Sequence, residues 1–416
     1  MRTLLLSVRA TGMLTLSLAL ALAAAPPDTA RAAQPVRAQG APALTVHNQP
    51  ALPVVALRMS IVADDPPGYA GAGHFFQHLL LPGLEEQVAR VGGHVQAIRG
   101  SDAVVYTVVG PASELDYLAG ILRGALRVPT QPGTAAMLQS LGALSDERAT
   151  ERETAPAYVR AALRGRLFPA DLPAAGTDDA AARLQTASLP DVWARVYAPD
   201  RVSIVAVGDV SLDAVERAFR SIPPASGDGA PTEAVDDTLP AFEADTPQAT
   251  RGWIAQAWRA DSADAAAMSV TARLLRSYLR RRMTRSNVEV EHWWTHHGQA
   301  LALVVATPDS LVRAARGTVG GALTAFRPTV NDDGVRAAAR ALRREMLFYS
   351  RTPERMAELL GEFADRGAGR DGAQRYYAAL DAVTQDDVRR VLDQLAAAEP
   401  ATVFVPPQRI PPEQRR

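Results

Sequence analysis

The sequence predicts an α+β fold that is divided into two halves. Its 416 residues are 47% hydrophobic and 21% charged, which is a globular composition with enough chain for two domains. The same order of strands, one helix, further strands and several helices occurs twice, although the two halves are not visibly alike in sequence. Between them, residues 223–250 hold prolines, acidic and small residues, a composition typical of a linker. We therefore predict an N-terminal domain at 40–222 and a C-terminal domain at 251–410.

The elements of the first half follow from periodicity and turn residues. Alternating β-branched residues predict two strands joined at 48–50, and a proline-rich loop at 64–68 then leads into a helix that carries two histidines. Apolar spacing of three and four predicts further helices, the first of them ending at Gly92 and Gly93. The predicted strands are 44–46, 54–62, 95–98, 103–109 and 201–207, and the further helices are 84–91, 115–128, 135–158 and one opening at 189.

The second half repeats this order. Strand-like alternation and amphipathic spacing again separate the elements. The predicted strands are 252–258, 288–294, 300–306 and 401–405, and the predicted helices are 263–283, 309–326, 332–349, 353–364 and 384–398.

Composition also limits the function. The formal net charge of -1 gives no overall field that would attract nucleic acid or an anionic membrane. All of the basic residues are arginine, which we interpret as a coding bias. The chain has no cysteine, so it has neither disulfides nor thiolate ligands, and any metal site must use histidines and carboxylates.

The N-terminus has the pattern of an export signal. Arg2 and Arg9 precede an apolar run at 13–25, and small residues follow it. The run is shorter than the ~20 residues needed to cross a bilayer, which favours cleavage over a membrane anchor. We therefore predict a signal peptide at 1–33, a periplasmic or secreted mature chain, and no membrane association after cleavage.

The strongest chemical motif is the pair His74 and His78. Four residues apart on a helix, the two imidazoles share one face and are able to bind one zinc ion. The pattern is close to H-x-x-E-H, in which the glutamate is the general base. Gln77 stands at the position of that glutamate. Since an amide cannot accept a proton near neutral pH, zinc binding can survive here without the chemistry.

With this motif and the further features given next, the chain resembles the pitrilysin/insulinase family of inverted-zincin metallopeptidases, which includes the mitochondrial processing peptidases. The matching features, in order, are Gly71-Ala72-Gly73-His74 to His78, Gly83, Gly92-Gly93, Leu167-Phe168-Pro169, Tyr197-Ala198-Pro199-Asp200-Arg201 and Val207-Gly208-Asp209. The resemblance covers most of the mature chain. It implies two related domains, each a mostly antiparallel sheet covered by helices, and a substrate chamber that is completed by a second chain.

The resemblance also implies further site residues. A glutamate on a downstream helix would be the third zinc ligand, and Glu147 lies close to the expected place, with Asp146 and Glu151 as alternatives. Active members take an arginine and a tyrosine from the second half to hold the substrate. The corresponding region, 280–290, has arginines but no tyrosine after them, so we interpret it as a solvated face or an ion-pair network.

The remaining histidines have a simpler interpretation. His292, His296 and His297 lie close to Glu291 and two tryptophans, and we expect a turn with the tryptophans packed inward rather than a metal site. His94, at the start of a predicted strand, is expected on the surface. The chain has no G-x-S-x-G elbow, phosphate-binding loop or dinucleotide fingerprint.

Three functions are consistent with these observations. The first is an exported, non-catalytic subunit that forms a chamber for unfolded peptides with a related, active metallopeptidase chain. The second is an active zinc endopeptidase that uses another carboxylate as its base. The third is a structural or binding protein that has kept only the fold.

Overall fold

The computed structural model describes residues 43–62, 65–100, 102–127, 132–168, 174–198, 201–220, 247–261, 264–369 and 371–408. The predicted signal peptide and residues 223–246 of the predicted linker lie outside the described residues. Within the described part of the chain, no helix is both long enough and apolar enough to span a membrane.

The first half contains a five-stranded sheet in the order β1-β5-β2-β4-β3. Its strands are β1 (Ala43–Asn48), β2 (Val54–Val62), β3 (His94–Arg99), β4 (Ala103–Pro111) and β5 (Val202–Gly208). Neighbouring strands are antiparallel except β1, which pairs in parallel with β5. Although β1 and β2 follow each other in the sequence, β5 therefore lies between them.

The second half contains a four-stranded sheet in the order β7-β8-β6-β9, with every pair antiparallel. Its strands are β6 (Gly252–Arg259), β7 (Asn287–Thr295), β8 (Gly298–Thr307) and β9 (Ala401–Val405). The long strand β8 is buried along almost all of its length, as expected for a strand with a neighbour on each side.

The helices of the first half differ from the prediction in three ways. Residues 84–91 are not a separate helix but mostly the end of α1. The predicted helix 135–158 is divided at Thr154, which is extended because Pro156 disfavours helical geometry nearby and has no N–H to donate. Two short helices, at 178–186 and 212–219, were not predicted. The helices are α1 (Ala72–Ala89), α2 (Leu115–Ala125), α3 (Thr134–Glu153), α4 (Ala155–Leu167), α5 (Asp178–Thr186), α6 (Leu189–Val196) and α7 (Leu212–Phe219).

In the second half, the predicted helix 309–326 is broken at Gly321, directly after Gly320, since glycine is a poor helix former. The helix at 372–382 was not predicted. The helices are α8 (Ala265–Arg282), α9 (Val312–Gly320), α10 (Ala322–Phe326), α11 (Asp332–Tyr349), α12 (Pro353–Asp365), α13 (Gly372–Ala382) and α14 (Gln385–Ala397), with 3-10 turns η3 (Asp309–Leu311) and η4 (Arg327–Thr329).

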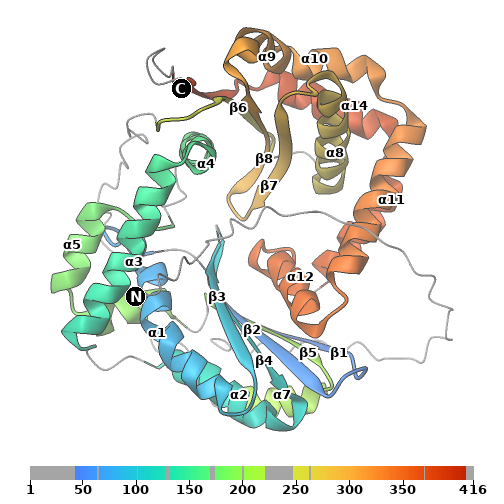
Figure 1. The fold of residues 1–416 in the computed structure, drawn as a ribbon. Helices are drawn as coiled ribbons and strands as arrows, with labels where there is room; N and C mark the ends of the chain where they lie inside the picture. Colours follow the sequence, from blue (N-terminus) through green and yellow to red (C-terminus); the bar gives the residue numbers. More distant parts are fainter. Residues whose placement is uncertain are drawn as a thin grey trace, which may run out of the picture.

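The two halves repeat one topology, which confirms the predicted fold class. The order β2, α1, β3, β4 of the first half corresponds to β6, α8, β7, β8 of the second. The orders of strands correspond as well, since β3-β4-β2-β5 matches β7-β8-β6-β9. By the same correspondence, α3 matches α11 and α4 matches α12. In Figure 1 the two sheets lie apart from each other, and helices cover each of them.

The matching helices α4 and α12 connect the halves by crossing over. α4 packs on β6 and β9 of the second sheet, whereas α12 packs on β2 and β5 of the first, as Figure 1 shows. The contact of α4 is an apolar cluster that includes Val159, Leu163 and Val403. The contact of α12 contains a buried ion pair between Arg58 and Asp365. Each sheet is thus covered by a helix from the other half.

Candidate metal centre

The helix that carries the two histidines starts at a buried carboxylate. Asp65, which is 5% exposed, accepts hydrogen bonds from the backbone N–H groups of Gly71 and Gly73, both at 2.8 Å. These groups belong to the first turn of α1, where N–H groups lack helical partners and the helix dipole favours a negative charge. His74 therefore lies in a turn that is fixed from outside the helix.

The opposite face of α1 is held by aromatic packing. Phe75 and Phe76 are fully buried. The rings of Phe76 and Trp193 pack edge to face, with their centroids 4.9 Å apart. Trp193 in turn stacks on Tyr197 at 3.8 Å. Since these rings fill the core under α1, the helix has little freedom to rotate about its axis. This rigidity directs His74 and His78 toward α3.

Glu147 of α3 completes a cluster with the two histidines. Its Oε2 atom lies 3.4 Å from Nε2 of His74, and its Oε1 atom lies 3.3 Å from Nε2 of His78. One ligand atom from each residue falls within 4.8 Å of the others. In a tetrahedral zinc site with bonds of about 2.0–2.1 Å, neighbouring ligand atoms are about 3.3 Å apart. The two distances between histidine and glutamate therefore match the spacing of ligand atoms in a zinc site.

The hydrogen bonds of the histidines also suit a metal ligand set. Nδ1 of His74 lies 3.1 Å from the carbonyl oxygen of Ala174, which can hold the proton on that nitrogen and leave Nε2 free to bind a cation. Nε2 of His78 is buried and makes no hydrogen bond, although Oε1 of Glu147 lies 3.3 Å away. A cation among the three ligands would give this nitrogen its missing partner. The residues present fit zinc.

The charge states agree with this arrangement. Burial lowers the pKa of His74 to about 4, although the Glu147 carboxylate opposes the shift; the neighbouring His78 and Arg99 add to it. Burial by itself raises the pKa of Glu147, but the imidazole of His78, followed by that of His74, lowers it overall. Near neutral pH the cluster thus consists of a neutral His74 and an anionic Glu147, which are the forms that bind metal.

Gln77 lies beside the cluster on the same helix. Its side chain is 4% exposed, and its Oε1 atom is buried without a hydrogen bond. An amide at this point can accept a hydrogen bond but cannot take a proton. The cluster therefore combines two histidines and a glutamate with an amide, rather than a carboxylate, at position 77.

The other carboxylates proposed from the sequence do not join the cluster. Asp146 is exposed on α3. Glu151 is partly buried one turn beyond Glu147, and burial, reinforced by the charge of Glu147, raises its pKa. Among the described residues, Glu147 is thus the only one of the three carboxylates grouped with both histidines. Whether the group binds zinc stays a prediction.

The histidines of the second half are placed as the sequence predicted. His296 and His297 form the turn between β7 and β8, and His296 donates its backbone N–H to Asp102 of the first half at 3.0 Å. His292 is bonded on both ring nitrogens, to Ser269 at 2.8 Å and Gln299 at 2.9 Å. Trp293 is 5% exposed and packs inward. His94 is exposed, with its Nε2 atom 3.4 Å from Glu354. Among the described residues, none of these histidines belongs to a metal-ligand group.

Two of the arginines at 280–290 make contacts with residues close to them in the chain. Nε of Arg280 donates to the carbonyl of Val288 at 3.0 Å, and the guanidinium of Arg282 stacks on Tyr278 at 4.6 Å. These contacts lie within the second half. They agree with the interpretation of the region as a solvated helix end.

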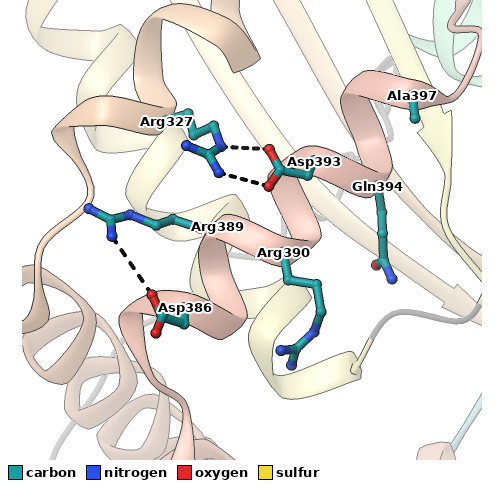
Figure 2. A pocket seen from close by; sticks show the side chains of 7 residues that line it. All are labelled: Arg327, Asp386, Arg389, Arg390, Asp393, Gln394 and Ala397. Atoms are coloured by element: carbon teal, nitrogen blue, oxygen red, sulfur yellow. Dashed lines mark hydrogen bonds and ion pairs between the residues drawn. The ribbon is translucent and has the colours of Figure 1, made fainter.

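A cavity of about 570 Å³ lies elsewhere, between η4 and α14, and two of its arginines are paired with carboxylates of its own lining. Figure 2 shows Arg327 bonded to both carboxylate oxygens of Asp393, and Arg389 paired with Asp386 at 3.7 Å. The lining residues are Arg327, Asp386, Arg389, Arg390, Asp393, Gln394 and Ala397. The cavity has no connection to the histidines of α1, and we assign it no role.

Sequence reasoning missed the residues that support the ligands. Asp65 was interpreted only as part of a loop, and Ala174 and Arg148 were not singled out. Asp65 stands six residues before Gly71, the N-cap position of α1, so the usual sequence pattern of an N-cap residue does not point to it. The Ala174 contact uses a backbone carbonyl 100 residues away from His74, which leaves no side-chain signal in the sequence.

No protein-family model and no curated protein matches this sequence. Solved structures do match. A protease from Helicobacter pylori has a TM-score of 0.73 at 14% identity, covering 87% of this chain and 97% of the other. A peptidase M16 inactive domain from Pseudomonas fluorescens has a TM-score of 0.72 at 14% identity, covering 89% and 97%.

A chain of complex III2 from Candida albicans is also similar, with a TM-score of 0.68 at 10% identity, covering 87% of this chain and 93% of that one. At these identities the likeness concerns the fold alone. The resemblance to the pitrilysin/insulinase family is therefore supported at the level of architecture: the chain has the fold of M16 peptidases, a fold that is also found in an inactive M16 domain.

Proposed function

We propose that this chain is an exported, zinc-binding and non-catalytic relative of the M16 peptidases, which forms a peptide-binding chamber together with a related, active chain. One observation carries the proposal. His74, His78 and Glu147 lie together, with distances of 3.4 Å and 3.3 Å from the two histidines to the glutamate, while Gln77 occupies the position of the general base. Zinc, when bound, would polarise a peptide carbonyl and acidify water, but no group at position 77 would accept the proton.

Export and partnership have separate support. Export rests on the basic residues and the apolar run before residue 26. Partnership rests on the resemblance, because active members of the pitrilysin/insulinase family complete their chamber with a second chain of this size. The fold of the complex III2 chain is in keeping with use of this architecture in an assembly.

The metal site is tested by elemental analysis of the purified mature chain. We expect about one zinc per chain in the wild type and none in His74→Ala or His78→Ala, since two ligands hold zinc weakly. His94→Ala serves as the control because this histidine is exposed and outside the cluster. Equal zinc content in all four proteins would refute the metal site and leave a protein that keeps only the fold.

The loss of catalysis is tested with unfolded peptides. The wild-type chain alone should show no chelator-sensitive cleavage, since loss of a general base typically lowers rates by about 10²- to 10⁴-fold. Gln77→Glu restores the carboxylate at nearly the same volume and should gain activity when a partner supplies the missing arginine and tyrosine. Robust, chelator-sensitive turnover by the wild type alone would instead identify an active endopeptidase.

The partner is tested by co-expression with a related chain that has an intact H-x-x-E-H motif. Size-exclusion chromatography with light scattering should then give the mass of a dimer. A stable monomer that ignores the related chain would contradict the subunit model while leaving the metal site untouched.

A further inference from the structure

Residues 174–176, which we call the 174–176 loop, form hydrogen bonds with both helices that carry the candidate ligands. The carbonyl oxygen of Ala174 lies 3.1 Å from Nδ1 of His74 on α1. The next carbonyl, that of Ala175, accepts a hydrogen bond at 2.9 Å from Nη1 of Arg148 on α3. Arg148 directly follows Glu147 in the chain. One short loop therefore contacts a ligand on α1 and the neighbour of a ligand on α3.

Arg148 anchors the end of α3 that carries Glu147. The buried residues of α3 are Ser140, Leu141, Leu144 and Arg148, so the last of them is a cation rather than an apolar side chain. Arg148 is 6% exposed, and its Nε and Nη2 atoms approach Oδ1 of Asp178 at 3.1 Å and 3.0 Å. With a third contact to Ala175, the planar guanidinium is fixed in one orientation.

The 174–176 loop is itself packed tightly against the start of α1. Gly176 has a φ of 70°, and a Cβ atom at this position would lie 2.2 Å from the carbonyl oxygen of Ala70. Gly71 has a φ of 86°, and a Cβ atom there would lie 2.7 Å from the Cα atom of Gly176. Since only glycine fits at both positions, the loop and the entry to α1 are in direct backbone contact. The loop cannot shift without moving the turn that holds His74.

We propose that Arg148 is a positioning residue for the metal ligands and acts through the 174–176 loop. The inference rests on the proposed zinc site. Arg148 holds the loop, the loop holds the Nδ1 side of His74 so that Nε2 faces Glu147, and the same arginine fixes the turn of α3 that presents Glu147. Arg148 touches no ligand atom itself. Its effect is to set the distance and orientation between the histidines and the carboxylate.

The test compares Arg148→Met with Arg152→Met in the mature chain. Arg152 lies one turn further on α3, is half exposed, and meets only the other oxygen of Asp178, at 3.5 Å. Loss of an outer contact of this kind typically lowers metal affinity about 10- to 100-fold. We expect a loss in this range for Arg148→Met and little change for Arg152→Met, measured by competition with a chromophoric zinc chelator.

A second measurement separates positioning from general stability. Cobalt(II) in place of zinc has visible absorption bands that depend on coordination geometry, so Arg148→Met should change their position or intensity while Arg152→Met keeps the wild-type spectrum. Asp178→Asn supplies a further variant that does not endanger folding, because this side chain is 68% exposed. We expect it to weaken zinc binding less than Arg148→Met does.

The outcomes distinguish the inference from the proposed function. If the wild type binds neither zinc nor cobalt, the proposed metal site fails, and the inference fails with it. If the wild type binds metal and Arg148→Met has the same affinity and the same cobalt spectrum, the positioning role alone is refuted. Equal losses in Arg148→Met and Arg152→Met would also refute it, because they would indicate an effect of charge. If Arg148→Met does not fold, unchanged affinity and spectrum in Asp178→Asn would be the refuting result.

Discussion

In the first half, α1 and α3 bring His74, His78 and Glu147 together, whereas the matching helices α8 and α11 of the second half bring together Arg273 and Glu345. Glu147 and Glu345 lie the same number of residues after the start of their helices, Thr134 and Asp332. Their surroundings differ. The side chain of Glu147 is 47% exposed, while that of Glu345 is 7% exposed and paired with an arginine.

The helix opposite each glutamate differs in the same way. Ala267 and Thr271 lie as far from the start of α8 as His74 and His78 lie from the start of α1. Both are buried, and Thr271 donates its hydroxyl to the carbonyl of Ala267 at 2.8 Å. The second half therefore has no ligand on this face of α8, and its glutamate takes part in a buried ion pair. The shared fold thus places a glutamate at the same point of α3 and α11, and the residues of the facing helix, α1 or α8, determine which groups this glutamate contacts.

Replacing each glutamate by glutamine is the most direct test of the different roles that we assign to Glu147 and Glu345. Glu147→Gln should lower zinc affinity by about 100-fold or more, because an amide oxygen is a poor zinc ligand and only two histidines remain. Glu345→Gln should leave zinc affinity close to wild type, since Arg273 and not a metal faces this group. Chelator competition measures both. Equal losses in the two variants would show that the halves do not divide the roles as we describe.

The ion pair of the second half should dominate stability instead. Arg273→Met leaves the Glu345 carboxylate buried without its cation, and removal of one partner of a buried pair typically costs about 3–5 kcal/mol. Arg336→Met, which breaks an exposed pair with Asp333 on the same helix, should change stability by less than about 1 kcal/mol. Urea unfolding of the two variants gives these values. A small effect of Arg273→Met would mean that Glu345 is not held by the arginine.

The sequence predicted the parts of this architecture that local signals specify. The spacing of His74 and His78 predicted their shared face, and the alternation along residues 103–109 predicted β4 to within two residues. The resemblance, rather than any spacing, pointed to Glu147. These features depend on residues that are close in the chain or that belong to a known pattern.

Contacts between distant segments were not predictable in this way. The break at Thr154 separates α3, which carries Glu147, from α4, which crosses to the other sheet, but the apolar pattern runs across it. The helix α5 has a weak pattern and was missed, although its first residue, Asp178, holds Arg148. The carbonyl of Ala174 has no side-chain signal at all. The residues that support the candidate ligands therefore follow from the folded structure and not from local sequence patterns.

The two crossing helices give a smaller test of the comparison between the halves. A Cβ atom at Gly361 of α12 would lie 2.1 Å from Nη1 of Arg58, which is 3% exposed, so Gly361→Ala should destabilise the protein by about 1–3 kcal/mol. Gly165 of α4 has no atom within 4 Å of such a Cβ, and Gly165→Ala should stabilise by about 0.5–1 kcal/mol. Thermal unfolding checks both. Changes of the same sign would show that the two crossing contacts are not packed differently.

The buried histidine of the second half, His292, contrasts with the candidate ligands because Ser269 and Gln299 occupy both of its ring nitrogens. Burial lowers the pKa of His292 to about 4, although the hydrogen bond with Gln299 opposes the shift. In the unfolded chain a histidine titrates near about 6.5, so between these two values the unfolded state binds more protons than the folded state. The contribution of His292 to stability is therefore present above pH ~6.5 and is lost as the pH falls toward 4.

His292→Gln removes this titration and should flatten the decline of the unfolding free energy between pH 6.5 and 4, measured by urea unfolding at several pH values in the presence of a chelator. His74 titrates over the same range, so part of the slope should remain in the zinc-free protein. His94→Gln, at an exposed histidine, serves as the control for the loss of a histidine as such. If His292→Gln keeps the wild-type slope, our assignment of a neutral His292 with hydrogen bonds on both ring nitrogens is wrong. The contrast between this histidine, held by protein groups, and the candidate metal ligands would then be wrong as well.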